Sequence, residues 1–265
     1  MQILKTEGVK KSFGGLTAVN NVDFDVNQGE IMGLIGPNGA GKTTFFNLIS
    51  GLYQIDTGSI VFDGVKISGR QPYHICRHGI GRTFQHAKNF PGLDIRENVM
   101  MGALFGKKGQ SRKQAAHEVD DILEYVGLGG QGHKHVPDLT LAMQKRVEVA
   151  RALATKPKLL LLDETMAGLN PTEVEEAMVL VKKVRDSGIT IIMIEHVMRA
   201  IMTICDRIFV LHHGARIASG LPDEVANDPA VIEVYFGQSD DSEGAAEAKT
   251  AETADSDKSA ESGES

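Results

Sequence analysis

The sequence predicts an α/β protein with a mostly parallel core β-sheet, and three observations lead to this fold class. Short, continuous apolar runs have the length of buried strands: IMGLIG at 31–36, LLLLD at 159–163 and TIIMI at 190–194. Segments with the apolar spacing of helices alternate with these runs. A glycine-rich loop joins the first run to such a segment, TFFNLISGL. Strands that alternate with helices imply a parallel sheet covered on both faces.

Local patterns predict the elements of the first half. VDFDV at 22–26 alternates and predicts a half-buried strand, and GSIVFDG at 58–64 predicts a strand that ends in an Asp-Gly turn. Beyond residue 70 the pattern is helical with interruptions. Ser111 and Gln114 form a possible capping box before an amphipathic stretch. The helical middle, about 87–158, therefore looks inserted between the glycine loop and the second apolar strand.

The second half continues the alternation of strands and helices. After LLLLD we expect a helix from Pro171 to about Asp186, the strand TIIMI, a helix from His196, the strand RIFVL and a hairpin-like HHGA before RIAS. The first of these helices has a good start, because Asn170 suits the N-cap and proline suits the first helical position.

The net charge of −7 is confined to the C-terminal tail. Residues 239–265 hold nine acidic residues and two lysines, whereas residues 1–238 are neutral. The tail lacks aromatic residues and cannot bury enough apolar surface to offset ordering entropy, so we expect a disordered, solvating segment. Partner binding by the tail is the lesser alternative. A neutral folded part without a basic stripe argues against a nucleic-acid partner.

Several features favour the cytosol. No apolar run approaches the roughly 20 residues that a membrane-spanning helix needs. The start, MQILKTEGVKK, lacks the long apolar core of a signal peptide. The two cysteines, Cys76 and Cys205, make no disulfide framework, so we expect a reducing compartment.

GPNGAGKT fits the phosphate-binding pattern G-x-x-x-x-G-K-[ST] in full. Glycines let the backbone wrap a phosphate, so that N–H groups and a helix N-terminus point at it. Lys42 is placed to reach the β- and γ-phosphates, and Thr43 to ligate Mg²⁺. A chance glycine turn is the alternative. The predicted nucleotide-binding residues of this loop are Gly36, Pro37, Asn38, Gly39, Ala40, Gly41, Lys42, Thr43 and Thr44.

Polar residues follow three of the predicted strands. Asp163 ends a buried strand and is placed to hold Mg²⁺, and Glu164 can polarise an attacking water. Gln85 follows IGRTF, and His196 follows TIIMIE; a glutamine there could sense Mg²⁺ and water, and a histidine could contact the γ-phosphate. Each of these two residues alone is more typical of a surface or capping position.

Taken in order, the phosphate loop, Gln85, the stretch LTLAMQ, LLLLDE, AGLNP and His196 resemble the ATPase subunit of an ABC transporter. FGGLTAVNNVDF, LDIRENVMMG, DETMAGLNPTEV and DPAVIEVYFG resemble the ATP-binding subunits of branched-chain amino acid importers in particular. The resemblance covers about residues 1–238. It implies an ABC ATPase domain with an N-terminal antiparallel β part and an inserted helical subdomain, followed by the tail at 239–265.

The resemblance assigns roles to matching positions. Phe13 stands where the family places an aromatic ring on adenine, although a core phenylalanine is the plain alternative. Lys42 and Thr43 match the phosphate and magnesium residues, and Gln85 matches a glutamine that links the site to the transmembrane partner. Asp163 matches the magnesium aspartate, Glu164 the catalytic glutamate and His196 the switch histidine. Asn170 lies in the loop that crosses the dimer, where many relatives have aspartate.

The signature stretch departs from the family pattern L-S-x-G-Q. Thr140 keeps a hydroxyl, Ala142 adds a methyl group where close approach matters, and Met143 loses an amide. Loss of one preorganised donor to a transition state costs on the order of 3 kcal/mol. We therefore expect this chain to pair with a second, different ATPase subunit whose signature is intact. A tolerated signature with normal homodimer activity is the alternative.

The resemblance implies an ATP hydrolase with Mg²⁺ that powers an importer for branched-chain amino acids or related small polar solutes. It also implies integral-membrane permease subunits, an indirect solute-binding protein and a peripheral location on the cytoplasmic face of the inner (plasma) membrane. Two alternatives stay open: an ATP-binding regulatory subunit with little hydrolysis of its own, and a soluble ABC ATPase without a transport role.

Overall fold

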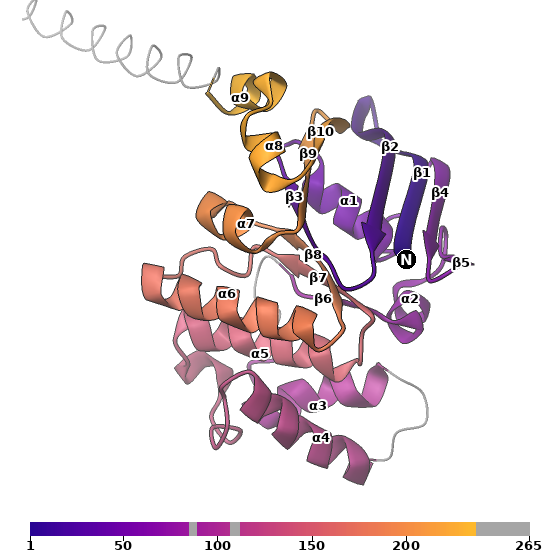
Figure 1. Ribbon diagram of the computed structural model, residues 1–265. Helices are drawn as coiled ribbons and strands as arrows, with labels where there is room; N and C mark the ends of the chain where they lie inside the picture. The colour runs from indigo at the N-terminus through magenta and orange to yellow at the C-terminus, as the bar shows by residue number, and fades with distance from the viewer. Residues whose placement is uncertain (85–88, 107–111, 237–265) are drawn as a thin grey trace, which may run out of the picture.

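The computed structural model describes residues 1–84, 89–106 and 112–236, and its strands form two sheets (Figure 1). The first sheet has four strands in the order β2-β1-β4-β5, and every neighbouring pair is antiparallel. Its strands are β1 (Gln2–Phe13), β2 (Leu16–Asn27), β4 (Thr57–Phe62) and β5 (Val65–Lys66). This sheet is the predicted antiparallel N-terminal part.

The second sheet has six strands in the order β10-β9-β3-β8-β7-β6. All neighbours are parallel except β10 and β9, which form the C-terminal hairpin. The strands are β3 (Ile31–Ile35), β6 (Ile80–Arg82), β7 (Leu159–Asp163), β8 (Thr190–Ile194), β9 (Arg207–His212) and β10 (Ala215–Gly220). The predicted mostly parallel sheet is confirmed.

Both faces of the parallel sheet are covered, as the continuous apolar strands require. In β7, Leu159 and Leu161 pack into the cluster shared with α1 and the antiparallel sheet, whereas Leu160 and Leu162 pack into the cluster that contains α6 and α7. Successive side chains of a strand point to opposite faces, so one run of four leucines serves two cores. Because β3, β6, β7, β8 and β9 run parallel, their carboxyl ends lie at one edge of the sheet.

Helices surround this sheet, and α3, α4 and α5 form a separate layer with its own apolar core (Figure 1). These three lie in the sequence between β6 and β7, where the helical insertion is predicted. The described helices are α1 (Lys42–Ile49), α2 (Pro72–His78), α3 (Ile95–Phe105), α4 (Arg112–Tyr125), α5 (Leu141–Ala154), α6 (Pro171–Asp186), α7 (Met198–Ile204), α8 (Pro222–Ala226) and α9 (Pro229–Phe236), with a 3₁₀ turn at Val136–Asp138.

Capping explains two helix starts, and one predicted start is wrong. Asn170 accepts a hydrogen bond from the Glu173 amide at 3.0 Å, and the Glu173 carboxylate accepts one from the Asn170 amide, so α6 begins with the expected cap. Asp94 and Glu97 cap α3 in the same way. The helix expected from His196 begins instead at Met198. Glu195 is held by hydrogen bonds to the 165–166 turn, so His196 lies in a short loop after β8.

Two expectations, the Ser111 cap and the disorder of the tail at 239–265, concern residues outside the described ranges. Within the described ranges, no helix combines the length and the apolar character that crossing a membrane requires.

Candidate functional site

The predicted phosphate loop connects β3 to α1 at the carboxyl edge of the parallel sheet. Its glycines are needed for two reasons. Gly36 and Gly41 have φ values of 149° and 102°, which side chains on L-residues disfavour. A Cβ atom would also lie 2.1 Å from the Leu211 carbonyl oxygen at Gly36 and 2.3 Å from the Ala18 carbonyl oxygen at Gly41. The loop is therefore shaped by close approach of neighbouring backbone.

The Lys42 side chain folds back onto the start of this loop. Its Nζ donates hydrogen bonds to the carbonyl oxygens of Gly36, at 2.6 Å, and Pro37, at 3.0 Å. Burial lowers the pKa of Lys42, and the nearby carboxylates of Glu164 and Asp163 oppose that shift. An ammonium group held inside the loop in this way can exchange carbonyl oxygens for phosphate oxygens. Thr43, the next residue of α1, is exposed.

Asp163 ends β7 and is 1% exposed. Its backbone N–H donates to Thr83 Oγ1 at 3.0 Å, and its Oδ2 accepts from Arg82 Nη2 at 3.0 Å. Burial raises the pKa of Asp163, while the Arg82 guanidinium opposes the rise. Among the residues that the structure describes, no group hydrogen-bonds to Oδ1. One buried carboxylate oxygen therefore remains available for a cation.

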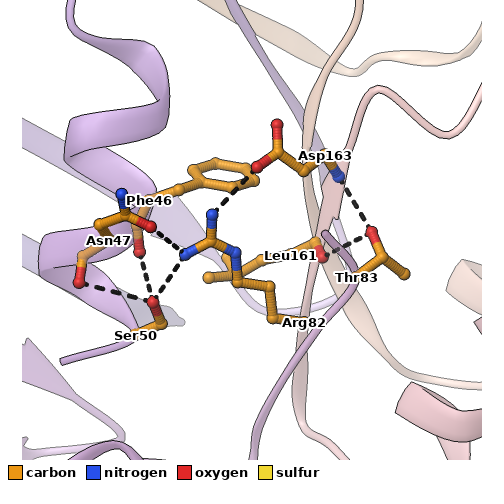
Figure 2. Close-up of polar contacts among 7 residues, drawn as sticks. All are labelled: Phe46, Asn47, Ser50, Arg82, Thr83, Leu161 and Asp163. Carbon is orange, nitrogen blue, oxygen red and sulfur yellow. Dashed lines mark hydrogen bonds and ion pairs between the residues drawn. The ribbon is translucent and has the colours of Figure 1, made fainter. Parts of the chain in front are cut away.

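Arg82 is a residue of this site that the sequence reasoning missed (Figure 2). Its Nη1 donates to Asn47 Oδ1 at 2.7 Å and to Ser50 Oγ at 2.9 Å, both at the C-terminal end of α1. The guanidinium also lies over the rings of Phe46 and Phe84. A charged residue at the end of the apolar strand β6, three positions before Gln85, was the signal that could have found it.

Glu164 sits in a backbone conformation that is unusual for its residue type, with φ of 52°. Both of its peptide groups are anchored: its N–H donates to the Ile194 carbonyl at 2.9 Å, and its carbonyl accepts from Lys145 Nζ at 2.9 Å. Its side chain then meets His196, with 2.9 Å between Oε1 and Nε2. The structure thus brings together two residues that the sequence predicted separately.

Glu195 and Lys145 are buried beside this pair and were also missed. Glu195 is 2% exposed, and its Oε1 accepts from Thr165 Oγ1 at 3.1 Å and from the Met166 N–H at 2.9 Å. Burial raises the pKa of Glu195 to about 7, partly opposed by these hydrogen bonds and by the charge of Lys145. Lys145 lies on α5, directly after the signature stretch. A glutamate inside a predicted strand–helix junction and a lysine in an otherwise packed helix carry no clear local signal.

Mg²⁺ fits the donor set that the structure describes. A carboxylate oxygen of Asp163 without a protein partner and the hydroxyl of Thr43 are the hard oxygen ligands that Mg²⁺ prefers. Gln85, the third predicted ligand, lies outside the described residues.

The remaining predicted residues occupy separate parts of the surface. Phe13 is partly exposed, and its ring meets Tyr53 edge-on with 5.1 Å between centroids. Thr140 caps α5 and accepts from the Met143 N–H at 3.4 Å. Ala142 and Met143 lie in the first turn of α5, so these three signature residues begin a different helix from the one that follows the phosphate loop.

A groove of about 530 Å³ opens between α2, β6, α3 and the end of α5. Apolar side chains dominate its wall, among them Ile75, Phe84, Phe90, Met101 and Phe105. Phe90 and Phe105 are 43% and 65% exposed. Arg82 lines the same groove, so this surface reaches directly to the partner of Asp163.

Comparison with known proteins identifies the family. A family model described as "ABC transporter" matches residues 19–167, and one described as "Branched-chain amino acid ATP-binding cassette transporter" matches residues 215–241. The chain belongs to the ATP-binding cassette family of ABC transporters. Members of this family bind nucleotide and hydrolyse ATP to power transport.

Curated relatives place the chain in the branched-chain amino acid group of this family. It is 37% identical to the high-affinity branched-chain amino acid transport ATP-binding protein BraF of Pseudomonas aeruginosa and 38% identical to LivG of Escherichia coli, which carries the same description. In both cases 250 residues align, covering 89% of this chain and 98% of the relative.

Solved structures of ATP-binding cassettes have the same fold. A nucleotide-free cassette from an ABC transporter matches with a TM-score of 0.81 and 30% identity, covering 89% of this chain and 99% of that one. A cassette in its ADP conformation matches with the same TM-score and 31% identity over the same shares of the two chains. A dimeric bacterial cassette matches with a TM-score of 0.76 and 26% identity, covering 83% of this chain and 99% of that one.

Proposed function

We propose that this chain is the ATP-hydrolysing subunit of an importer for branched-chain amino acids or related small polar solutes. The observation that carries the proposal is the contact between Glu164 and His196, 2.9 Å apart beside Lys42 and Asp163 at one edge of the sheet. The transport role and the substrate class rest on the relatives BraF and LivG, whose descriptions name branched-chain amino acid transport.

In the proposed reaction, water attacks the γ-phosphoryl group of ATP, the bond from the γ-phosphorus to the bridging oxygen breaks, and ADP and inorganic phosphate leave. Lys42 offsets the charge that develops on the β- and γ-phosphates. Glu164 polarises the attacking water, and His196 holds Glu164 and contacts the γ-phosphate. Mg²⁺, held by Thr43 and Asp163 with Gln85 as the predicted third residue, supplies further charge neutralisation when bound. Phe13 stacks on adenine.

The groove beside Arg82 is the proposed docking site for a permease subunit. It is apolar, it is rimmed by exposed phenylalanines, and strand β6 lines one side of it. An exposed apolar groove of this kind is typical of a surface that receives a partner. Docking at this groove fits the proposed peripheral location on the cytoplasmic face of the inner (plasma) membrane. A solute-binding protein then acts only through the permease.

Two ATPase subunits are proposed to form the working unit. Thr140, Ala142 and Met143 belong to the start of α5 and not to the loop between β3 and α1, which supports a role toward a nucleotide on another chain. Because Ala142 and Met143 weaken this signature, the favoured partner is a second, different subunit with an intact one. Asn170, at the start of α6, is placed in the loop that crosses between them.

ATP turnover by the purified chain, measured against its own concentration, tests this proposal. Glu164→Gln serves as the blank, since it keeps the phosphate loop but lacks the carboxylate. Turnover that depends on Glu164 and rises steeply with concentration supports hydrolysis by homodimers and contradicts the need for a second subunit. ATP binding with almost no turnover supports the heterodimer. Absence of ATP binding refutes the proposed function itself.

The altered signature also favours a second candidate function. A regulatory subunit that binds ATP with little hydrolysis of its own needs the phosphate loop but not an intact signature. Turnover that stays at the Glu164→Gln level after addition of a second ATPase subunit with an intact signature would select this candidate.

A further inference from the structure

Arg82 connects three parts of the molecule that are distant in sequence. Its Nη1 reaches Asn47 and Ser50 at the end of α1, and its Nη2 reaches Asp163 at the end of β7 (Figure 2). The residue itself ends β6. The helix that starts at the phosphate loop, the strand that leads toward Gln85 and the strand that carries the predicted magnesium ligand therefore share one side chain.

The geometry of this contact is restrictive. The Arg82 side chain is 7% exposed, and its guanidinium is planar, so its two N–H-bearing ends point in set directions. The rings of Phe46 and Phe84 lie 5.6 and 5.1 Å from the guanidinium carbon and hold it further. With its plane held in this way, Arg82 offers Asp163 a single, defined donor.

That donor decides which oxygen of Asp163 remains available. Arg82 occupies Oδ2, and within the described ranges nothing hydrogen-bonds to Oδ1. Because a carboxylate is rigid, holding one oxygen sets the direction of the other. The 3.0 Å hydrogen bond from the Asp163 N–H to Thr83 Oγ1 anchors the backbone of the same residue.

We propose that Arg82 is a positioning residue that sets Asp163 for Mg²⁺ and links this carboxylate to α1 and to the docking groove. The inference rests on the proposed function, because it assumes that Asp163 ligates the magnesium of a bound nucleotide. Arg82, Ser50 and Phe84 all line the groove.

The test compares nucleotide binding with and without magnesium. A fluorescent ATP analogue is titrated into the full chain in EDTA and in Mg²⁺. The Kd in EDTA divided by the Kd in Mg²⁺, called the Kd ratio below, reports how much the metal strengthens nucleotide binding. Mn²⁺ binding to the chain with ATP, followed by electron paramagnetic resonance, gives a direct second measurement. Loss of a residue that orients a metal ligand typically costs about 10- to 100-fold in metal affinity. Arg82→Gln should reduce the Kd ratio by this amount while Kd in EDTA changes less than about twofold.

Two further variants keep the test valid if Arg82→Gln folds poorly. Asn47→Ala and Ser50→Ala remove the α1 acceptors of Arg82 without leaving the buried Asp163 charge unpaired. Each of these two variants should reduce the Kd ratio several-fold. Asn47→Asp retains an oxygen acceptor for Arg82 and should keep the Kd ratio close to that of the wild type. Arg207→Gln is the matched control, because Arg207 pairs with Asp25 and Glu30 at another site and should leave the ratio unchanged.

The outcomes separate this inference from the proposed function. A wild-type chain that does not bind ATP refutes both. A wild-type chain whose ATP affinity rises with Mg²⁺, together with an unchanged ratio in Arg82→Gln, Asn47→Ala and Ser50→Ala, overturns the role of Arg82 alone. An equal reduction in the Arg207→Gln control also overturns it, because the effect would then be a general consequence of a lost ion pair.

Discussion

Replacing Glu195 by glutamine should change how stability depends on pH. The amide oxygen of glutamine can still accept from Thr165 Oγ1 and the Met166 N–H, so the turn after Glu164 keeps both hydrogen bonds. What the substitution removes is a buried group that can ionise. In the wild type, burial raises the pKa of Glu195 from its ordinary value of 4.5 to about 7.

The sign and size of the effect follow from these two values. As the pH rises above 4.5 the unfolded chain loses the Glu195 proton first, because the folded protein holds it until about pH 7. The stabilisation that the folded protein gains by holding Glu195 protonated is therefore fully present below pH 4.5, declines between pH 4.5 and 7 and is absent above that range. At about 1.4 kcal/mol for each pH unit, the loss amounts to about 3 kcal/mol.

Urea unfolding of the full chain, followed by far-ultraviolet circular dichroism in EDTA without nucleotide, measures this quantity. The free energy of unfolding of Glu195→Gln minus that of the wild type should increase by about 3 kcal/mol from pH 4.5 to pH 8. Any constant cost of the amide cancels in this comparison. A difference that stays level across the range would show that Glu195 ionises normally in the folded protein. A difference that decreases would show that Lys145 stabilises its charged form.

Three other variants test separate parts of the protein. Glu164→Gln should bind ATP with near wild-type affinity but lower kcat by at least about a hundredfold, since the group that polarises water is gone; turnover close to the wild type in the presence of the partner subunit would contradict the role of Glu164. Ala142→Gly combined with Met143→Gln should raise turnover of the concentrated chain by up to about a hundredfold, and unchanged turnover would show that the variant signature is tolerated. Phe105→Glu should abolish co-purification with co-expressed permease subunits without altering ATP binding, whereas Val179→Glu, at an exposed apolar position on α6, should change neither. Retention of the Phe105→Glu variant on the permease would show that docking occurs elsewhere.

Local patterns were sufficient for much of the fold and for the phosphate loop. The buried strands, the helices between them and the cap at Asn170 depend on neighbours within a few residues, so short stretches of sequence are enough to predict them. The sequence predicts the start of α7 two residues too early, because Glu195 accepts hydrogen bonds from a turn about 30 residues away, which no local pattern encodes. The role of Gln85 stays a prediction, because it lies outside the described residues.

Sequence patterns alone predict the alternation of strands and helices, the glycine loop that ends in Lys42 and Thr43, and the acidic residues at the end of β7. The contacts of Arg82 with α1 and Asp163, the hydrogen bond from Lys145 to the backbone of Glu164, and the burial and raised pKa of Glu195 come from the folded chain. The contacts join residues 19 to 81 positions apart, and they exist because parallel strands bring their carboxyl ends to one edge. The raised pKa arises from desolvation, which depends on everything packed around a group rather than on its neighbours in sequence.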